Sequence, residues 1–384
     1  MKKFPFSLPL VLDGATGTNL MKKGLSGGEC PERWILENPD ALTGLQSEFA
    51  ENGSDLLLAP TFGANSVKLS HYGLEDKLFE YNKKLTELTK KTAGDKILVA
   101  GELSPTGLFI EPFGEAQFSD IVEVYKNQGK ALFNAGVDIF YVETLMSLCD
   151  ARAAVLGLSD FKLPIFVSFT VGETGRTLSG TDILCALSTL QAMGVDAFGL
   201  NCSTGPEDMA KHIEKLAPYA KIPLIAKPNA GIPDADGNYS FTLEDTARGF
   251  EKLLEAGAEI IGGCCGVTPE HIAKIREISE NFEFKNRPKT DAVIVGYETN
   301  ACVLDDRMPM SEIYSVRIES DGDGCDFAQT AFTVKTPVSF ISDNENALEN
   351  ALFLYQGRAI IDRKSGISDA AKIRLSEKYG AVIF

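Results

Sequence analysis

The hydrophobic pattern alternates between short apolar runs and longer segments that are apolar on one side only. Each run is almost continuously apolar where it begins, as expected for a strand buried on both faces of a parallel sheet. Eight such runs predict eight strands, and they begin at Pro9, Asp55, Ile97, Asp138, Ile165, Ala197, Leu224 and Ile260.

The amphipathic segments between these runs predict helices. "DALTGLQSEFAENG" begins at Asp40, and "TLEDTARGFEKLLEAG" begins at Thr242. Several segments end in a glycine just before the next run, as helices often do; these are Gly53, Gly136, Gly194 and Gly257. Eight strand–helix units in about 280 residues predict a (β/α)8 TIM barrel. A doubly wound open sheet is the alternative, but the chain has no dinucleotide-binding fingerprint to favour it.

The pattern changes after about Asn286. "KNRPKT" is typical of a linker, and weaker apolar runs follow at 291–296, 313–319, 337–342, 358–362 and 380–384. One strong helix, "ENALENALFLYQ", begins at Glu345 between two of these runs. We therefore predict a barrel domain over residues 1–286 and a small α/β module over residues 291–384.

Composition restricts the partners and the compartment. The chain of 384 residues has a net charge of −17, and its acidic residues are dispersed. This argues against nucleic acid as a partner, because phosphate binding requires clustered Lys and Arg. No apolar stretch approaches the ~18 residues of a membrane span, and Pro5 and Pro9 interrupt any signal-peptide core. We expect a cytoplasmic protein whose thiols stay reduced.

Eight cysteines are present, and five of them resemble ordinary core or surface residues: Cys30, Cys149, Cys185, Cys302 and Cys325. The other three follow strands. Cys202 closes the sixth run, and Cys264 with Cys265 closes the eighth. In a barrel the carboxyl ends of the strands converge on one mouth, where active sites are built. The three thiols should therefore meet.

The stretch "GGCCG" raises a geometric difficulty, because neighbouring side chains of a regular strand point to opposite faces. Its glycines allow the backbone to leave the pleat, so both thiols can turn toward one point. Three thiolates are a recognised zinc ligand set, and three protein ligands leave the open position of a catalytic site. Packed core cysteines are the alternative, and the spacing alone leaves both interpretations open.

Five stretches together resemble the homocysteine S-methyltransferase family: "DGATGTNL", "GRTLSGTD", "GLNCSTGPEDM", "PNAGIPDADGNY" and "IIGGCCGVTPEHI". They are most similar to the N-terminal homocysteine-binding module of cobalamin-dependent methionine synthase. The resemblance runs from about Leu10 to about Ile278. It implies an enzyme of the methionine synthase type in which Cys202, Cys264 and Cys265 hold zinc.

The implied reaction is methyl transfer to the thiol of homocysteine, giving methionine. That thiol should have a pKa near ~8.5, by analogy with cysteine, and is a poor nucleophile until it is deprotonated. Zinc binds it as a thiolate at neutral pH. The thioether product is a far poorer ligand and should leave.

The amino-acid end of homocysteine needs its own partners. The backbone N–H groups of Gly14 and Ala15 precede a predicted helix and suit a carboxylate. Asp13 and Glu143, at the ends of the first and fourth strands, are predicted to hold the ammonium group, and the resemblance supports Glu143 in that role. A capping or turn role is the alternative for Asp13. Three asparagines at strand ends are interpreted as partners of the loop backbone: Asn65, Asn201 and Asn229.

The barrel does not identify the methyl donor. The resemblance favours methylcobalamin on a separate corrinoid carrier protein. A betaine or S-methylmethionine type donor is an alternative, and so is a non-catalytic accessory protein that binds homocysteine or zinc. Residues 291–384 resemble part of a pterin-binding domain but are much shorter than the roughly 200 residues of a full barrel. We expect this module to bind no folate and to help dock the carrier; covering an exposed barrel surface is the alternative.

Overall fold

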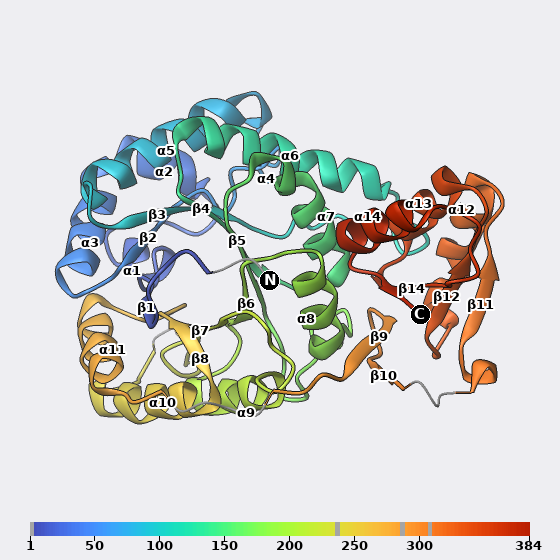
Figure 1. Ribbon diagram of the computed structural model, residues 1–384. Helices are drawn as coiled ribbons and strands as arrows, with labels where there is room; N and C mark the ends of the chain where they lie inside the picture. Colours follow the sequence, from blue (N-terminus) through green and yellow to red (C-terminus); the bar gives the residue numbers. More distant parts are fainter. Residues whose placement is uncertain (1–3, 235–238, 285–288, 306–308) are drawn as a thin grey trace.

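The computed structural model describes residues 4–234, 239–284, 289–305 and 309–384. Its larger part is a ring of eight parallel strands surrounded by helices (Figure 1). The strands are β1 (Leu10–Val11), β2 (Leu56–Ala59), β3 (Leu98–Leu103), β4 (Ile139–Leu145), β5 (Ile165–Phe169), β6 (Ala197–Asn201), β7 (Leu224–Lys227) and β8 (Ala258–Ile261). All eight predicted strands are confirmed. Only β8 begins more than one residue from its predicted start, two residues before Ile260.

The strands follow the order β1-β8-β7-β6-β5-β4-β3-β2. A parallel bridge between Leu12 and Leu56 closes the ring between β1 and β2. Asp55 reinforces this seam, because its N–H donates to the Val11 carbonyl at 2.7 Å and its carboxylate accepts from the Val11 N–H at 2.8 Å. The predicted (β/α)8 barrel is confirmed.

Eleven helices accompany the described part of the barrel: α1 (Gly17–Met21), α2 (Pro31–Glu37), α3 (Pro39–Glu51), α4 (Ser66–Ser70), α5 (Leu78–Ala93), α6 (Phe118–Ala135), α7 (Leu148–Leu158), α8 (Ile183–Ala192), α9 (Pro206–Leu216), α10 (Leu243–Ala256) and α11 (Pro269–Asn281). The 3-10 turns η1 (Glu75–Lys77) and η2 (Ser159–Phe161) adjoin α5 and α7. The four glycines predicted to end helices all have positive φ. Among the described helices, none is long and apolar enough to cross a membrane.

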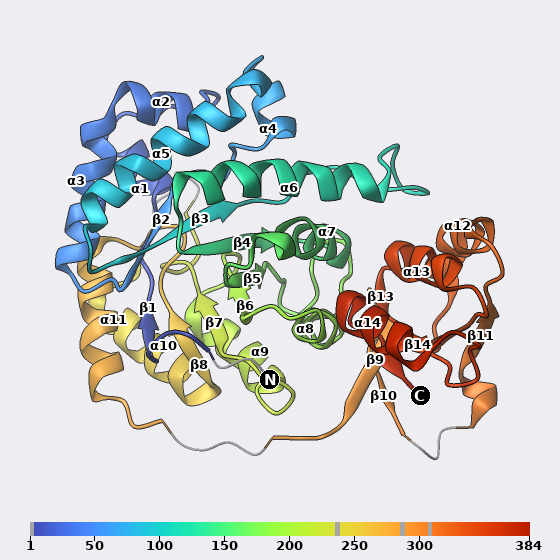
Figure 2. The same ribbon diagram turned by 45° about the horizontal axis from the view of Figure 1, so that its top comes forward.

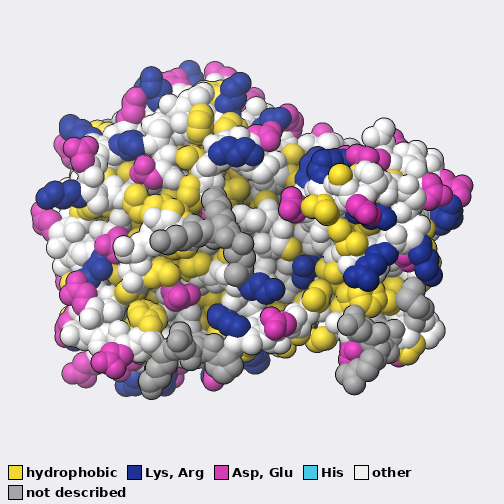
Figure 3. All heavy atoms as spheres, viewed as in Figure 1, with side chains coloured by type: hydrophobic (Ala, Val, Ile, Leu, Met, Phe, Trp, Pro, Cys, Tyr) yellow, Lys and Arg dark blue, Asp and Glu magenta, His cyan; other side chains and the backbone are white. Residues whose placement is uncertain are grey.

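The N-terminal end of the barrel is closed by aromatic side chains. Phe4 stacks on Phe166 of β5 with ring centres 5.9 Å apart, and Phe6 meets the same ring edge-on. On this face acidic and basic side chains are interspersed (Figure 3). The polar residues that follow the strands lie at the opposite, C-terminal end of the barrel.

The C-terminal module contains two small sheets. One is antiparallel and joins β10 (Cys302–Leu304), β9 (Val293–Tyr297) and β13 (Gly357–Arg358). The other is parallel and joins β11 (Tyr314–Arg317), β12 (Val338–Ile341), β14 (Ile360–Ile361) and β15 (Val382–Ile383). Its helices are α12 (Asp321–Thr330), α13 (Glu345–Leu354) and α14 (Asp369–Tyr379), with the 3-10 turns η3 (Met310–Glu312) and η4 (Ala331–Thr333).

The sequence pattern missed β10, α12 and α14, and it fused β13 with β14. The pattern does not predict helix α12, because "DGDGCDFAQT" contains two glycines and few apolar residues. A capping box stabilises its start, in which the side chain of Ser320 accepts from the N3 backbone and Asp323 accepts from the Ser320 N–H. Local capping thus compensates for poor intrinsic helix propensity.

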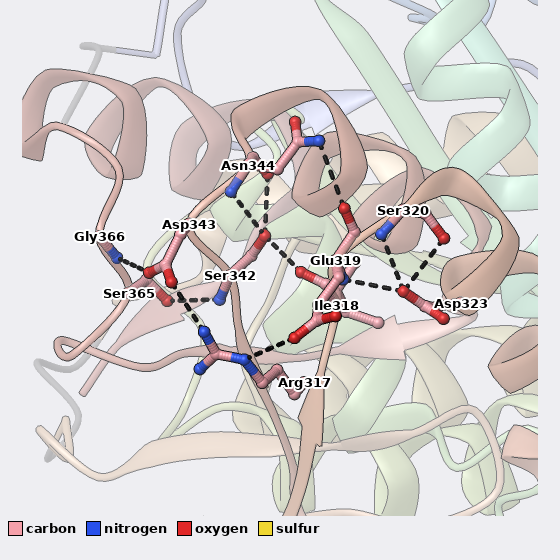
Figure 4. Close-up of polar contacts among 10 residues, drawn as sticks. All are labelled: Arg317, Ile318, Glu319, Ser320, Asp323, Ser342, Asp343, Asn344, Ser365 and Gly366. Carbon is pink, nitrogen blue, oxygen red and sulfur yellow. Dashed lines mark hydrogen bonds and ion pairs between the residues drawn. The ribbon is translucent and has the colours of Figure 1, made fainter.

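Hydrogen bonds tie together the C-terminal ends of the parallel strands in this module (Figure 4). The buried hydroxyl of Ser342, after β12, lies 2.6 Å from the Ile318 carbonyl that follows β11. The Ser342 N–H donates to Ser365 Oγ at 3.1 Å. Arg317 pairs with Asp343 at 2.7 Å. These polar groups therefore find their partners inside the module.

The module packs against α7 and α8 of the barrel (Figure 2). Arg152 of α7 is fully buried, and it donates to the Leu352 carbonyl at 2.8 Å and to Gln356 Oε1 at 3.1 Å. The Cys185 thiol of α8 donates to the Tyr297 carbonyl at 3.1 Å. The predicted domain boundary near residue 286 and most of the predicted linker fall within residues 285–288, outside the described residues.

Candidate metal and substrate site

The three cysteines singled out from the sequence come together at the C-terminal mouth of the barrel. The sulfurs of Cys202, Cys264 and Cys265 all lie within 4.8 Å of one another, and each residue is partly exposed. Tetrahedral zinc with bonds of ~2.3 Å would separate its sulfur ligands by roughly 3.8 Å. The spacing therefore fits three ligands of one metal ion. Among the described residues, no other cluster of Cys, His, Asp and Glu has this spacing.

Unusual backbone geometry produces this convergence. Cys202 has φ 61°, a left-handed conformation that is uncommon for a residue with a side chain. After β8, Gly266 has φ 82°, and a Cβ there would lie 2.2 Å from the ring of Tyr239. Only glycine fits at that turn. The turn takes the place of a regular pleat, so Cys264 and Cys265 can present their thiols to Cys202.

The three cysteine side chains also form hydrogen bonds with one another. Hydrogen bonds from Cys264 and Cys265 lower the pKa of Cys202 well below its ordinary value. The same hydrogen bond to Cys202, with burial, raises the pKa of Cys264 well above its usual value. Hydrogen bonding within the cluster therefore favours the thiolate form of Cys202, and thiolates are the ligand form that zinc and other soft or borderline cations prefer.

Four ionisable side chains meet inside the barrel next to the thiols: Asp13, Glu102, Glu143 and Lys227. Lys227 Nζ lies 2.7 Å from Glu143 Oε2, and the two side chains are only 2% and 7% exposed. The ammonium also lies 4.9 Å from the centre of the Tyr141 ring. Burial opposes the charge of Lys227, but Glu143 and its other anionic neighbours raise the pKa of Lys227 well above its ordinary value.

The carboxyl groups of this cluster are unusual. Burial raises the pKa of Glu102 well above its ordinary value, and the charge of Glu143, to which it hydrogen-bonds, adds to the effect. Burial likewise raises the pKa of Asp13 to about 7, although the charge of Lys227 opposes it. Asp13 Oδ2 accepts from the Leu58 N–H at 2.9 Å, whereas Oδ1 is buried without a hydrogen-bond partner. Three carboxyl groups therefore face one lysine, and the raised pKa values of Glu102 and Asp13 favour the neutral forms of these two groups.

The backbone N–H groups of Gly14 and Ala15, which are predicted to donate to the carboxylate of the substrate, lie in a crowded part of the barrel. The Ala15 N–H donates to the Val267 carbonyl at 3.1 Å. A Cβ at Gly14 would lie 2.7 Å from the ring of Phe49 and 2.8 Å from the same carbonyl. Helix α1 begins at Gly17 and has only five residues. Of the two predicted N–H groups, that of Ala15 is therefore already engaged within the chain.

The predicted asparagines differ in what they contact. Asn65 caps α4 by accepting from the Lys68 N–H at 2.9 Å, which confirms its interpretation as a loop partner. The Asn201 side chain accepts a hydrogen bond from the Thr144 N–H and donates one to the Thr144 hydroxyl. Asn229 Oδ1 is buried without a hydrogen-bond partner. Part of the "PNAGIPDADGNY" motif, residues 235–238, lies outside the described residues.

Sequence reasoning missed two members of the cluster, Glu102 and Lys227. Each lies in an apolar run that was read correctly as a strand, "LVAGEL" and "LIAK". An ionisable residue inside a strand buried on both faces is costly unless it has a partner or a function. That cost is the signal that would have identified both residues.

The family model for homocysteine S-methyltransferases matches residues 10–279. Among curated relatives, the methionine synthase of Mycobacterium tuberculosis is 31% identical over 333 residues, covering 80% of this chain and 27% of that protein. The methionine synthase of Mycobacterium leprae is 31% identical over 331 residues, with the same coverage of 80% and 27%. The chain thus spans only a minor part of the length of these relatives.

The fold has solved counterparts. The homocysteine methyltransferase MmuM from Escherichia coli, in its metallated form, superimposes with a TM-score of 0.60 at 23% identity, covering 70% of this chain and 95% of that chain. At 23% identity this structural similarity supports the assignment of the barrel fold and nothing more specific. The family match spans the whole barrel, including the three converging cysteines and the acidic cluster beside them. The chain therefore belongs to the homocysteine S-methyltransferase family.

Proposed function

We propose that this chain transfers a methyl group to the thiol of homocysteine and produces methionine. The observation that carries the proposal is the convergence of Cys202, Cys264 and Cys265 at the mouth of the barrel. The number, type and spacing of these ligands suit zinc, with one coordination position left for substrate. Zinc held by these three cysteines would supply a Lewis acid that favours the thiolate form of the substrate at neutral pH.

The chain's own residues bind and orient the amino-acid end of the substrate. Asp13, Glu102 and Glu143 provide three carboxyl groups against the single ammonium of Lys227. This excess of acid suits the ammonium group of an amino acid. Asp13 Oδ1 and Glu143 are the proposed acceptors, because Asp13 Oδ1 has no hydrogen-bond partner and Glu143 already accepts from the ammonium of Lys227.

We propose that the methyl group comes from methylcobalamin on a separate carrier protein. The similarity to methionine synthases supports this donor. Residues 291–384 would help dock the carrier. A cavity of about 610 Å³ lies where this module meets the barrel loops, and Phe109, Phe113 and Phe332 contribute to its apolar walls.

Methionine formation tests the proposal. The zinc-loaded chain of 384 residues is supplied with homocysteine and, in turn, with methylcobalamin, glycine betaine, S-methylmethionine or methyltetrahydrofolate. We expect product with methylcobalamin and none with the folate. The Cys264→Ala variant should be inactive, whereas Cys325→Ala, which removes an exposed thiol of the C-terminal module, should retain activity. Absence of methionine with every donor would refute the methyltransferase function, and product only with betaine or S-methylmethionine would replace the proposed donor.

A further inference from the structure

We propose that a second cavity, at the N-terminal end of the barrel, is a binding site for a small anion that carries a phosphate or carboxylate group. The cavity has a volume of about 420 Å³. Arg358 and Lys221 line it and are the residues that would bind the anion. The inference goes beyond the proposed function, because this cavity lies at the opposite end of the barrel from the three cysteines.

The cavity lies between the barrel and the C-terminal module. Its barrel side includes Asp196, which precedes β6, and Pro223, which precedes β7, so it belongs to the N-terminal end of the strands. Its other side includes Val293 of β9 and Arg358 of β13. These two strands pack against α8 (Figure 2). A bound anion would therefore contact both parts of the chain.

Arg358 is a partly buried cation without a carboxylate partner among the described residues. Its Nε donates to the Gly380 carbonyl at 2.9 Å, and its Nη1 donates to the Ile294 carbonyl at 3.0 Å. A guanidinium has five N–H donors, so these two bonds leave donors on Nη1 and Nη2 for a ligand. Burial lowers the pKa of Arg358 to about 10. A desolvated charge is costly without a partner, and an anion from solution would supply that partner.

Lys221 supplies a second positive charge on a wall that is already fixed in place. Its side chain is exposed and lines the cavity. The Lys221 N–H donates to Gln191 Oε1 at 3.0 Å, and Gln191 Nε2 donates to the Tyr219 carbonyl at 3.1 Å. The side chain of Gln191 in α8 thus holds the segment before β7, and binding would require little reorganisation of this wall.

One acidic side chain, that of Asp196, lines the same cavity. It is engaged within the barrel, because its Oδ2 accepts from the Ile165 N–H at the start of β5 at 3.0 Å. The net charge of the chain is −17, which repels anions at long range. An anion would therefore be held only by local donors, and saturable binding of one anion per chain would indicate a specific site.

The donors and the size of the cavity define the class of ligand. The planar guanidinium of arginine suits the paired oxygens of a carboxylate or a phosphate. The volume of about 420 Å³ lies within the roughly 300–1,000 Å³ of small-molecule sites. It leaves room for an organic part beside the anionic group, and the rings of Phe4 and Tyr219 are available to contact that part. The ligand class is a small phosphorylated or carboxylated metabolite.

Isothermal calorimetry tests the proposal with two simple probes, inorganic phosphate and succinate, at constant ionic strength. Each probe is titrated into the zinc-loaded chain of 384 residues. We expect one saturable site per chain, and the tighter probe distinguishes a phosphate from a carboxylate ligand. Saturating homocysteine should leave the affinity unchanged, because the proposed homocysteine site is at the other end of the barrel.

Arg358→Gln should weaken binding of the tighter probe roughly 10- to 150-fold, the range of one charged hydrogen bond. Lys221→Gln should weaken it roughly two- to fivefold, because an exposed charge contributes less. Arg374→Gln is the control, because Arg374 lies on α14, is half exposed and already pairs with Glu345 and Glu349. It should leave the affinity unchanged.

Hydrogen exchange of the wild type provides a measurement that does not depend on a variant folding. Saturation with the tighter probe should slow amide exchange in β13 and at the starts of β7 and β9, whereas α2 and α4 at the barrel mouth should be unaffected. This readout decides the matter if Arg358→Gln, which also loses its bonds to the Gly380 and Ile294 carbonyls, does not fold.

Three results would overturn the proposal. The first is the absence of saturable binding with both probes. The second is an affinity that neither Arg358→Gln nor Lys221→Gln lowers, or that Arg374→Gln lowers equally, since the anion would then bind elsewhere or through net charge alone. The third is competition by homocysteine, which would place the anion at the barrel mouth.

Discussion

Asn201 and Thr144 join the ends of β6 and β4 through two hydrogen bonds. Asn201 Oδ1 accepts from the Thr144 N–H at 2.8 Å, and its Nδ2 donates to Thr144 Oγ1 at 2.8 Å. Thr144 has φ 62°, and Cys202, the next residue after Asn201, has φ 61°. Two left-handed residues are therefore supported by one amide side chain, between a proposed zinc ligand and the strand that carries Glu143.

Asn201→Ala should accordingly weaken both the fold and the metal site. The loss of three hydrogen bonds, two with Thr144 and one with the Ser168 hydroxyl, should cost about 1–3 kcal/mol of unfolding free energy. Zinc should also be lost to a competing chelator at a lower chelator concentration, because the backbone before Cys202 is released. Urea denaturation and chelator competition measure the two effects.

Asn65→Ala is the matched control for this variant. It removes an asparagine that only caps α4, so it should cost about 1 kcal/mol and leave zinc retention unchanged. Equal zinc retention in the two alanine variants would contradict a positioning role for Asn201.

We predict one zinc ion per chain, which is lost in Cys202→Ala, Cys264→Ala and Cys265→Ala. Each variant removes one of three sulfurs that lie within 4.8 Å of one another, and two thiolates alone bind zinc poorly. Metal analysis after dialysis measures the stoichiometry. Cys302→Ala, outside the cluster, should keep its zinc. Full retention in all three cluster variants would eliminate the site.

Asp13 should make stability depend on pH. Burial raises its pKa from 3.8 to about 7, so the native state binds a proton that the unfolded chain has already released. Its contribution to stability is complete below pH 3.8 and is lost as pH rises through about 7. Asp13→Asn, which keeps an acceptor for the Leu58 N–H, should abolish this slope and stabilise the protein by roughly 2–4 kcal/mol near neutral pH.

Unfolding free energies of the wild type and Asp13→Asn, measured at a series of pH values from mildly acidic to neutral, check this prediction. The informative quantity is the difference between the two proteins, because it cancels the titration of all other groups. A difference that stays constant with pH would show that Asp13 has an ordinary pKa in the native state.

Arg152 should be essential for the junction between the barrel and the C-terminal module. Its guanidinium donates to the Leu352 and Phe353 carbonyls and to Gln356 Oε1, all at the end of α13. Arg152→Met would leave these buried acceptors without donors and should cost roughly 2–4 kcal/mol.

Arg374→Met provides the comparison on the surface. Arg374 is half exposed and pairs with Glu345 and Glu349, so its loss should cost at most about 1 kcal/mol. Urea denaturation of both variants measures the contrast. Similar small losses would mean that the buried guanidinium does not hold the module to the barrel.

The barrel and its cysteines could be predicted because their signals are local. A short, continuous apolar run predicts a strand buried on both faces, and Cys202, Cys264 and Cys265 each follow such a run. The contact between Glu143 and Lys227 could not be predicted in the same way. It depends on which side chains of β4 and β7 face each other across the interior, and that follows from the stagger of the closed sheet rather than from the order of residues.

The C-terminal module was harder to read for a different reason. Its strands β13, β14 and β15 have only two residues each, too few to show a period. Helix α12 is stabilised by its capping box more than by its composition, whereas α14 has good helix formers but buries only Ala371, Lys372, Leu375 and Tyr379, too few large apolar residues to show a helical period. Tertiary context therefore decides the secondary structure there.

The way the barrel closes has a consequence for its dynamics. Neighbouring strands β2 and β3 pair over four residue positions, whereas β1 meets β2 at the single bridge of Leu12 with Leu56. Local opening should start at this seam, and its amides should exchange with solvent before those of the other strand pairs. Asp13 crosses the same seam through its hydrogen bond from the Leu58 N–H. A substrate that engages Asp13 would therefore slow amide exchange along β1 and β2 far more than around the rest of the ring.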